Sequence, residues 1–72
     1  MIPEYKIQKG DLVDEFIGMM MNKHDIELPV IRMHAGKYLI GTESRMATIK
    51  GTVCMVRVGG GYEAIESYIM RN

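Results

Sequence analysis

The sequence lacks several features that larger or exported proteins depend on. It has no Trp, one Cys, two Pro and no net charge, because nine Lys and Arg balance nine Asp and Glu. With Cys54 alone no intrachain disulfide can form, and secreted domains of this size usually need such links, so we expect an intracellular, reducing compartment. No run approaches the ~18 apolar residues of a membrane span. Residues 1–4 lack the basic flank of a signal peptide.

The residues that are present are typical of one small globular domain. Hydrophobic residues make up 47% and charged residues 25% of the 72, a composition too apolar for a disordered chain. The core must be thin, because a chain this short buries only about 60% of its unfolded surface. This length excludes barrel enzymes and two-domain dinucleotide enzymes. Eight Met are present, three of them in the run 19–21, which favours core filling over an adaptable binding surface.

Residues 11–24 have the pattern of an amphipathic helix. Apolar side chains recur there at steps of three and four, at Leu12, Val13, Phe16, Ile17 and Met20. Asp11 follows the breaker Gly10 and is placed to cap the helix. Gly18 is unfavourable inside a helix by about 1 kcal/mol relative to Ala, so we expect it to permit a close approach of backbone.

The charged residues at the two ends of this helix have a structural explanation. Asp14 and Glu15 lie in its first turn, and Lys23 and His24 lie in its last turn. The helix dipole favours negative charge in the first turn and positive charge in the last turn. No functional role is needed to account for them.

After residue 24 the pattern changes to short strands. We expect strands at 26–33, 37–40, 45–50 and 52–58, and Pro29 suggests that the first is an edge strand or contains a bulge. Short connections favour an antiparallel meander, because parallel crossovers need a dozen or more residues.

A second helix is expected after the glycines of 59–61, since the apolar positions from Tyr62 to about Met70 have helical spacing. The predicted fold is α+β, a two-layer arrangement of helix, antiparallel four-strand meander and helix. In the fourth strand we expect Cys54, Val56 and Val58 to face the core and Arg57 to face away.

The sequence contains no convincing catalytic, phosphate or metal site. The glycines of 59–61 precede a helix, but the Lys and Ser or Thr of a phosphate-binding loop are missing, so they predict a chain reversal with positive φ or close packing. His24, His34 and Cys54 have no short ligand spacing. Cys54 lies in the middle of a predicted strand, a poor place for a nucleophile. We predict that the protein is not an enzyme.

The balanced charge is unevenly distributed along the chain. Residues 1–31 carry three Lys against six Asp and Glu, a net charge of −3, and residues 60–72 carry −1. Residues 32–59 carry five cations against Glu43 alone, a net charge of +4. Two interpretations are open: the cations protect strand edges from aggregation, or they form a patch for an acidic polymer.

Residues 55–62 read MVRVGGGY and are followed by the helical segment 64–69. This stretch resembles the signature MVRVGGGW and the following helix of the growth-arrest-specific-two related (GAR) domain, which occurs at the end of spectraplakin-type cytoskeletal linkers. Residues 36–41 resemble the KYxxG strand of the family, and residues 13–15 resemble the opening of its first helix.

The resemblance implies a GAR-like domain over 11–72, preceded by an N-terminal extension over 1–10. It implies the family's fold of helix, antiparallel meander and helix. It also implies a non-enzymatic module that binds microtubules, located in the cytoplasm on the cytoskeleton, the axoneme included. The structural motif comprises Gly59, Gly60, Gly61 and Tyr62, with Tyr62 where the family has Trp.

Microtubule binding would use the basic strands, because tubulin has an acidic surface and salt would weaken the attraction. The predicted microtubule-binding residues are Arg32, Lys37, Arg45, Lys50 and Arg57. The alternative is a structural module that keeps the fold but uses a Met-rich helix face or a sheet edge for a cytoskeletal protein partner or for self-association. Nucleic acid is disfavoured, since stacking needs aromatics among the basic strands and Tyr38 alone qualifies.

The cysteines that can hold zinc in the family are missing from this sequence. The CxC after the first helix is replaced by Asn22, Lys23 and His24, and the chain ends at Asn72 before a DPC segment. We therefore predict no metal and no cofactor.

Overall fold

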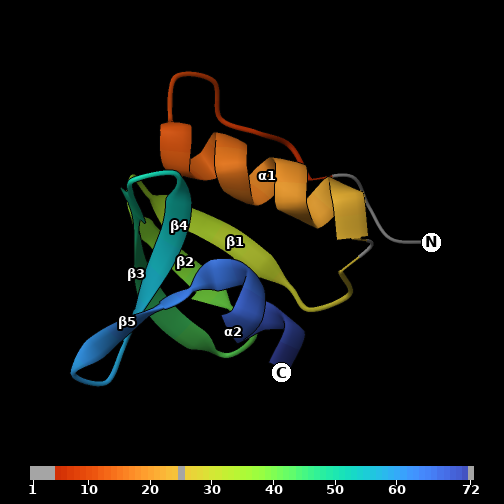
Figure 1. The fold of residues 1–72 in the computed structure, drawn as a ribbon. Coiled ribbons are helices and arrows are strands. Elements are labelled where there is room, and N and C mark those ends of the chain that lie inside the picture. The colour runs from red at the N-terminus through yellow and green to blue at the C-terminus, as the bar shows by residue number, and fades with distance from the viewer. Residues whose placement is uncertain (1–4, 25, 72) are drawn as a thin grey trace.

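The chain folds into two helices that pack on one antiparallel sheet (Figure 1). The computed structural model describes residues 5–24 and 26–71. The elements are α1 (Leu12–His24), β1 (Val30–His34), β2 (Lys37–Ile40), β3 (Glu43–Lys50), β4 (Val53–Val58), β5 (Gly61–Ala64) and α2 (Ile65–Arg71). The predicted α+β class is confirmed, and so is the antiparallel meander between the two helices.

The strands lie in the order β1–β2–β3–β4–β5, and each neighbouring pair is antiparallel. β3 divides its length between two partners: Glu43–Met46 pairs with β2, and Ala47–Lys50 pairs with β4. The sheet therefore changes direction in the middle of β3, and the arrows of Figure 1 fan around the core.

The core lies between the sheet and the helices. α1 packs against β3 and β4, and α2 packs against β4 and β5. Ile17 of α1, Tyr38 of β2 and Ile65 of α2 are fully buried and belong to one apolar cluster. Both helices therefore cover the same face of the sheet, which we call the inner face.

The alternation of β4 agrees with its sequence. Cys54 and Val56 are completely buried, and Val58 packs against the core cluster. Arg57 is exposed. The prediction of which side of β4 faces the core is confirmed.

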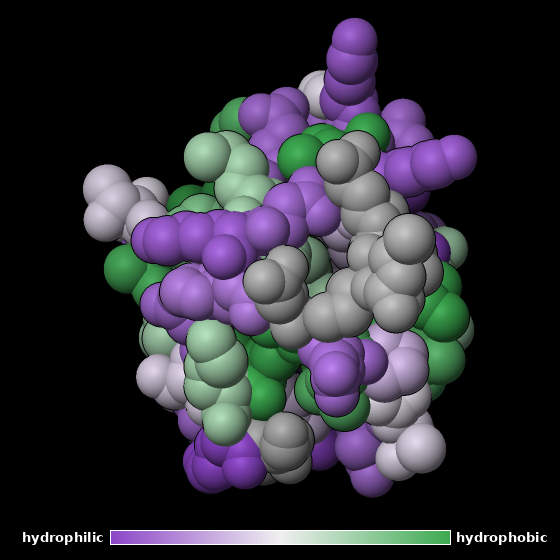
Figure 2. All heavy atoms as spheres, turned by 90° about the vertical axis from the view of Figure 1, so that its right-hand side faces the viewer, coloured by the Kyte–Doolittle hydropathy of each residue, from purple (hydrophilic) through white to green (hydrophobic). Residues whose placement is uncertain are grey.

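The methionine run is divided between core and surface. Met20 is 5% exposed and lies in the core, whereas Met19 is 69% exposed. Apolar side chains also reach the surface between hydrophilic ones on the side of the molecule shown in Figure 2. Core filling therefore accounts for only part of the run.

α1 begins where the sequence predicted. The N–H of Asp14 donates to Oδ1 of Asp11 at 3.1 Å, and the N–H of Glu15 donates to the Asp11 carbonyl at 2.9 Å. Asp11 is therefore the N-cap, because its side chain satisfies an N–H that has no partner within the helix.

Residues 5–10, which we call the strap, run back along α1 before the helix begins (Figure 1). Residues 1–4 of the expected N-terminal extension lie outside the described residues. The Tyr5 N–H donates to Oδ1 of Asn22 at 2.9 Å, and the Gly10 N–H donates to Oε2 of Glu15 at 3.3 Å. The strap thus contacts both ends of α1.

Gly18 makes this close approach possible. It is buried in α1, and a Cβ built on it would overlap the side chain of Ile7 in the strap. The expected close approach at Gly18 is present, but the groups that approach are the side chains of Ile7 and Tyr5 in the strap and not backbone.

The sheet has five strands where the sequence predicted four. Residues 61–64 form β5, and α2 begins only at Ile65. Tyr62 was assigned to the helix from its spacing, but it pairs with Arg57 of β4. Gly59 has a φ of 62°, a left-handed conformation that lets the chain reverse and pair with β4. The predicted chain reversal at 59–61 is therefore confirmed at Gly59.

The first strand is shorter than predicted. It begins at Val30 and not at residue 26. Pro29 precedes it, and its carbonyl accepts a hydrogen bond from the Gly41 N–H at 2.7 Å. A proline has no N–H to donate in the hydrogen bonding between strands. The predicted irregularity is present, but later: the register of β1 with β2 shifts between Arg32 and His34.

We predict that Gly18→Val lowers the free energy of unfolding by about 1–3 kcal/mol, because its methyl groups would displace Ile7 and the strap. Val has a better helix propensity than Gly, so a loss cannot come from propensity. Gly60→Val is the matched control, since nothing lies within 4 Å of a Cβ at Gly60. Urea unfolding measures both. Equal stabilities for Gly18→Val and the unaltered protein would contradict the close packing of strap and helix.

Candidate functional site

The face of the sheet opposite the helices is open and carries both basic and apolar side chains. We call it the outer face, and the pairing register identifies its members. Its residues are Ile31, Lys37, Leu39, Ser44, Met46, Thr48, Lys50, Val53, Met55, Arg57, Tyr62 and Ala64. None of these is an Asp or Glu, although the described part of the strands contains both Glu43 and Glu63.

The two strand carboxylates belong to the inner face by register. Glu43 lies opposite Ile40, and Glu63 lies opposite Val56. Lys50 and Arg57 are exposed, and Lys37 is partly exposed. Within residues 5–24 and 26–71, no carboxylate forms an ion pair with any of these three cations. The outer face is therefore positively charged.

Lys50 and Tyr62 form a contact on this face. The Lys50 Nζ lies 3.8 Å from the centroid of the Tyr62 ring, well within the range of a cation–π interaction. Tyr62 is 45% exposed. The contact holds an ammonium group and an aromatic ring together at the surface, across the strand that carries Arg57.

The other two predicted cations lie on the inner face. Arg32 and Arg45 are both opposite Tyr38, from β1 and β3. The Arg32 Nε donates to Oδ2 of Asp11 at 2.9 Å. The Arg45 Nε donates to the Tyr68 hydroxyl at 3.1 Å.

The structure thus groups Lys37, Lys50 and Arg57 on one face and engages Arg32 and Arg45 in contacts with the helical layer.

The pKa values of these groups reflect the same contacts. The hydrogen bond to Asp11 raises the pKa of Arg32, and the hydrogen bond to Tyr68 raises the pKa of Arg45. Partial burial acts to raise the pKa of Asp11, but the hydrogen bonds from Asp14 and Arg32 outweigh it, so the pKa lies below its usual value. The Asp11–Arg32 pair joins the start of α1 to β1.

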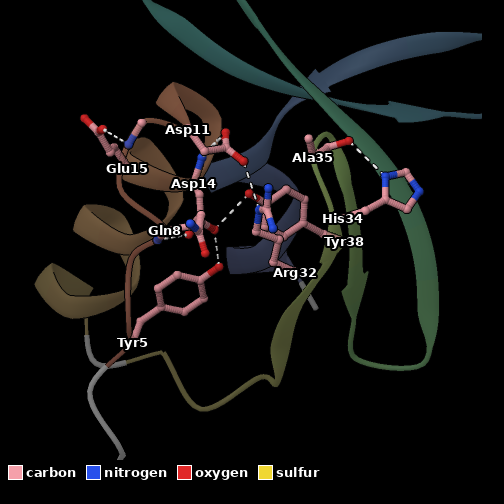
Figure 3. Close-up of polar contacts among 10 residues, drawn as sticks. Tyr5, Gln8, Asp11, Asp14, Glu15, Arg32, His34, Ala35 and Tyr38 are labelled. Carbon is pink, nitrogen blue, oxygen red and sulfur yellow. Dashed lines mark hydrogen bonds and ion pairs between the residues drawn. The ribbon is translucent and has the colours of Figure 1, made fainter.

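Asp14 has a role that its place in the helix did not reveal. It is 1% exposed, and three donors from two other segments meet its carboxylate (Figure 3). Tyr5 and Tyr38 donate through their hydroxyls to Oδ1, the second at 2.8 Å, and the Gln8 N–H donates to Oδ2 at 2.6 Å. The helix dipole accounts for a charge in the first turn but not for a buried one. The burial of Asp14 could have been predicted from the sequence only by pairing it with Tyr5 and Tyr38, which lie 9 and 24 positions away.

The tyrosines that reach Asp14 are held in their neutral form. Burial, and then the hydrogen bond to Asp14, raise the pKa of Tyr5 and of Tyr38 above the usual value of 10. A neutral hydroxyl donates to a carboxylate, whereas a phenolate would repel it. The site is therefore a structural hydrogen-bond centre that joins the strap, α1 and β2.

The side chains that might be considered for zinc do not fit a metal site. The thiol of Cys54 is fully buried in the core, and burial raises its pKa to about 11, so it stays protonated. His34 lies in the turn after β1, with Nδ1 3.0 Å from the Ala35 carbonyl oxygen. His24 Nε2 lies 2.6 Å from Oε2 of Glu66. Among the described residues, no three His, Cys, Asp or Glu are placed so that they could hold one metal ion.

The described residues form a small domain in which an antiparallel meander is packed against two helices. A family model, the Growth-Arrest-Specific Protein 2 Domain, matches residues 11–72. The chain belongs to this family, whose members are non-catalytic binding domains associated with the cytoskeleton. The resemblance in the MVRVGGGY stretch is thereby confirmed. A comparison with curated proteins found no match.

Neither helix in the described part of the chain has the length and hydrophobicity needed to cross a bilayer.

We predict that Tyr38→Phe lowers the free energy of unfolding by about 1–3 kcal/mol, because the buried Asp14 carboxylate loses a hydrogen-bond donor that water cannot replace. Tyr62→Phe is the matched control: the same hydroxyl is removed from a side chain that is 45% exposed. Chemical denaturation compares the two variants. A Tyr38→Phe protein as stable as the Tyr62→Phe protein would show that the hydroxyl does not support Asp14.

Stability should also fall in alkaline solution. A tyrosine whose pKa is raised in the folded state contributes stability that is complete below the unfolded pKa, near 10, and is lost as the pH rises above it. We expect the urea midpoint to decrease between pH 9 and pH 11, and to decrease less steeply in Tyr5→Phe. Parallel curves for the variant and the unaltered protein would disprove the contribution of Tyr5.

Proposed function

We propose that the domain binds microtubules directly through Lys37, Lys50 and Arg57 on the outer face. The observation that carries this proposal is the separation of charge: three cations, none in an ion pair with a described carboxylate, lie on an open face whose described residues include no Asp or Glu. Family membership supports a cytoskeletal partner. Tubulin presents an acidic surface, which such a face attracts at long range.

The zero net charge of the chain does not oppose this proposal. The paired carboxylates are not on the outer face by register. Asp11 and Glu66, at the helices, contact Arg32 and His24, and the inner-face residues Glu43 and Glu63 pair with Arg45 and Arg71. An approaching polymer responds to the local charge of the surface more than to the net charge of the chain, because salt screens charges more than about 8 Å away.

Arg32 and Arg45 have a different part in the proposal. Each is already bound to a side chain of the helical layer, and its use as a tubulin contact would break that bond. We assign them to maintaining the sheet beneath the outer face.

The apolar members of the outer face favour a second candidate, a protein-interaction module without tubulin binding. Ile31, Met46 and Val53 are 54%, 49% and 41% exposed. Apolar side chains set among cations are suited to a partner that offers both an acidic rim and apolar anchors. This candidate predicts binding that high salt weakens only slightly.

Cosedimentation with polymerised tubulin over a salt series tests the proposal. We expect Arg57→Glu and Lys50→Glu each to weaken binding by about fivefold or more at low salt, because each replaces an attraction with a repulsion. Lys6→Glu is the matched control: Lys6 is exposed, but it lies in the strap and not on the sheet.

Three results would contradict the proposal. They are a failure of the unaltered domain to pellet with microtubules at low salt, equal effects of Lys6→Glu and Arg57→Glu, or binding that does not respond to salt. Binding to a cytoskeletal protein with no tubulin pelleting would support the second candidate.

A further inference from the structure

One face of α1 has no partner within the described residues. Ile17 and Met20 face the sheet, while Asp14 and Gly18 face the strap. A third stripe, which we call the α1 stripe, recurs at steps of three and four residues and consists of Leu12, Glu15, Met19 and Lys23. Leu12, Met19 and Lys23 are exposed, and Glu15 is partly exposed. Phe16 lies at the margin of the stripe and packs against the core cluster.

The α1 stripe is apolar at its centre. Leu12 is 70% exposed and Met19 is 69% exposed, the two largest values among the exposed large hydrophobic side chains. Phe16 is partly buried. A shallow groove continues from Met19 over Phe16, Met20 and Ile7 of the strap to Glu66 of α2. A partner helix would therefore find apolar contacts on the stripe and beside it.

The charges of the α1 stripe are arranged symmetrically about Met19. Glu15 lies four residues before it and Lys23 four residues after it, so both lie on the same face of the helix as Met19. Among the described residues, the hydrogen bond that reaches the Glu15 carboxylate comes from the Gly10 N–H, at 3.3 Å to Oε2. Lys23 is exposed, and no carboxylate in the described part of the chain pairs with it.

We propose that α1 is a self-association surface, on which two copies of this chain pair their α1 helices antiparallel about a two-fold axis at Met19. In that arrangement, Glu15 of each copy faces Lys23 of the other, and the two Met19 side chains meet at the centre. A two-fold interface must be complementary to itself, and opposite charges at equal distances from a central apolar residue meet that condition. A parallel pairing would instead bring like charges together.

The dimer should be weak and should depend on concentration. α1 has 13 residues, and such a helix is about 20 Å long at 1.5 Å per residue. Two helices of this length bury less surface than a standard protein interface. The α1 stripe lies on the far side of the helix from the sheet, so dimerisation leaves the outer face free and places two outer faces in one assembly.

Sedimentation velocity over a wide concentration range tests the proposal. The unaltered chain should shift reversibly from monomer toward dimer as its concentration rises. Met19→Glu should weaken the dimer by about tenfold or more, because it places two carboxylates at the centre of the interface. Met70→Glu is the matched control, since Met70 is a methionine on α2 with an exposure of 54%. Thermal unfolding confirms that both variants are folded.

The orientation has a test of its own that uses charge reversal. Lys23→Glu and Glu15→Lys should each abolish the homodimer by placing like charges opposite each other. A mixture of the two variants should form a heterodimer, because every pair across the two-fold axis is then complementary. A single chain carrying both reversals should dimerise as the unaltered chain does.

Several outcomes would overturn the proposal. A chain that stays monomeric at the highest concentration has no such surface. Equal effects of Met19→Glu and Met70→Glu would place the contact elsewhere. Charge variants that do not recover on mixing would exclude the antiparallel arrangement. None of these outcomes depends on tubulin, so this inference and the proposed function can fail separately.

Discussion

The carboxylate of Asp14 is the interaction on which the architecture depends. It is buried at the junction of three segments: the strap, the first turn of α1 and strand β2. A charge withdrawn from water is very costly unless it is fully hydrogen-bonded, so Tyr5, Gln8 and Tyr38 must all be in place together. This condition links local helix formation to the docking of the strap and the sheet, and in a domain with a thin core such a link selects one arrangement.

The same layer determines where positive charge is available. Asp11 caps α1 and binds Arg32, and Tyr68 of α2 binds Arg45. Cations on the inner face are therefore committed to holding helices against strands, whereas Lys37, Lys50 and Arg57 are left at the surface. The period-two alternation of the strands separates structural from available cations. A chain with no net charge can in this way group three cations on one face of the sheet and keep its paired carboxylates at the helices or on the inner face.

Much of the fold was accessible from residue patterns because those patterns are local. The N-cap at Asp11, the amphipathic stripe of α1 and the alternation of β4 depend on neighbours a few residues away, and they were predicted correctly except at one position. Leu12, expected in the apolar stripe, is 70% exposed. β5 was missed because Tyr62 and Ile65 also have helical spacing, while the pairing of Tyr62 with Arg57 depends on the reversal at Gly59. Tyr38, which the sequence suggested as an aromatic residue available for stacking, is fully buried. The exposed aromatic side chain on the outer face is Tyr62.

The class of fold, the family and the candidate basic residues were accessible before folding, because composition, periodicity and the MVRVGGGY stretch are properties of the chain in order. Which cations share a face, why Asp14 is buried, and which side of α1 lacks a partner among the described residues depend on the folded arrangement. The physical reason is that side-chain direction depends on strand register and helix docking. A hydrogen bond between Asp14 and Tyr38, 24 positions apart, exists only after the chain has closed on itself.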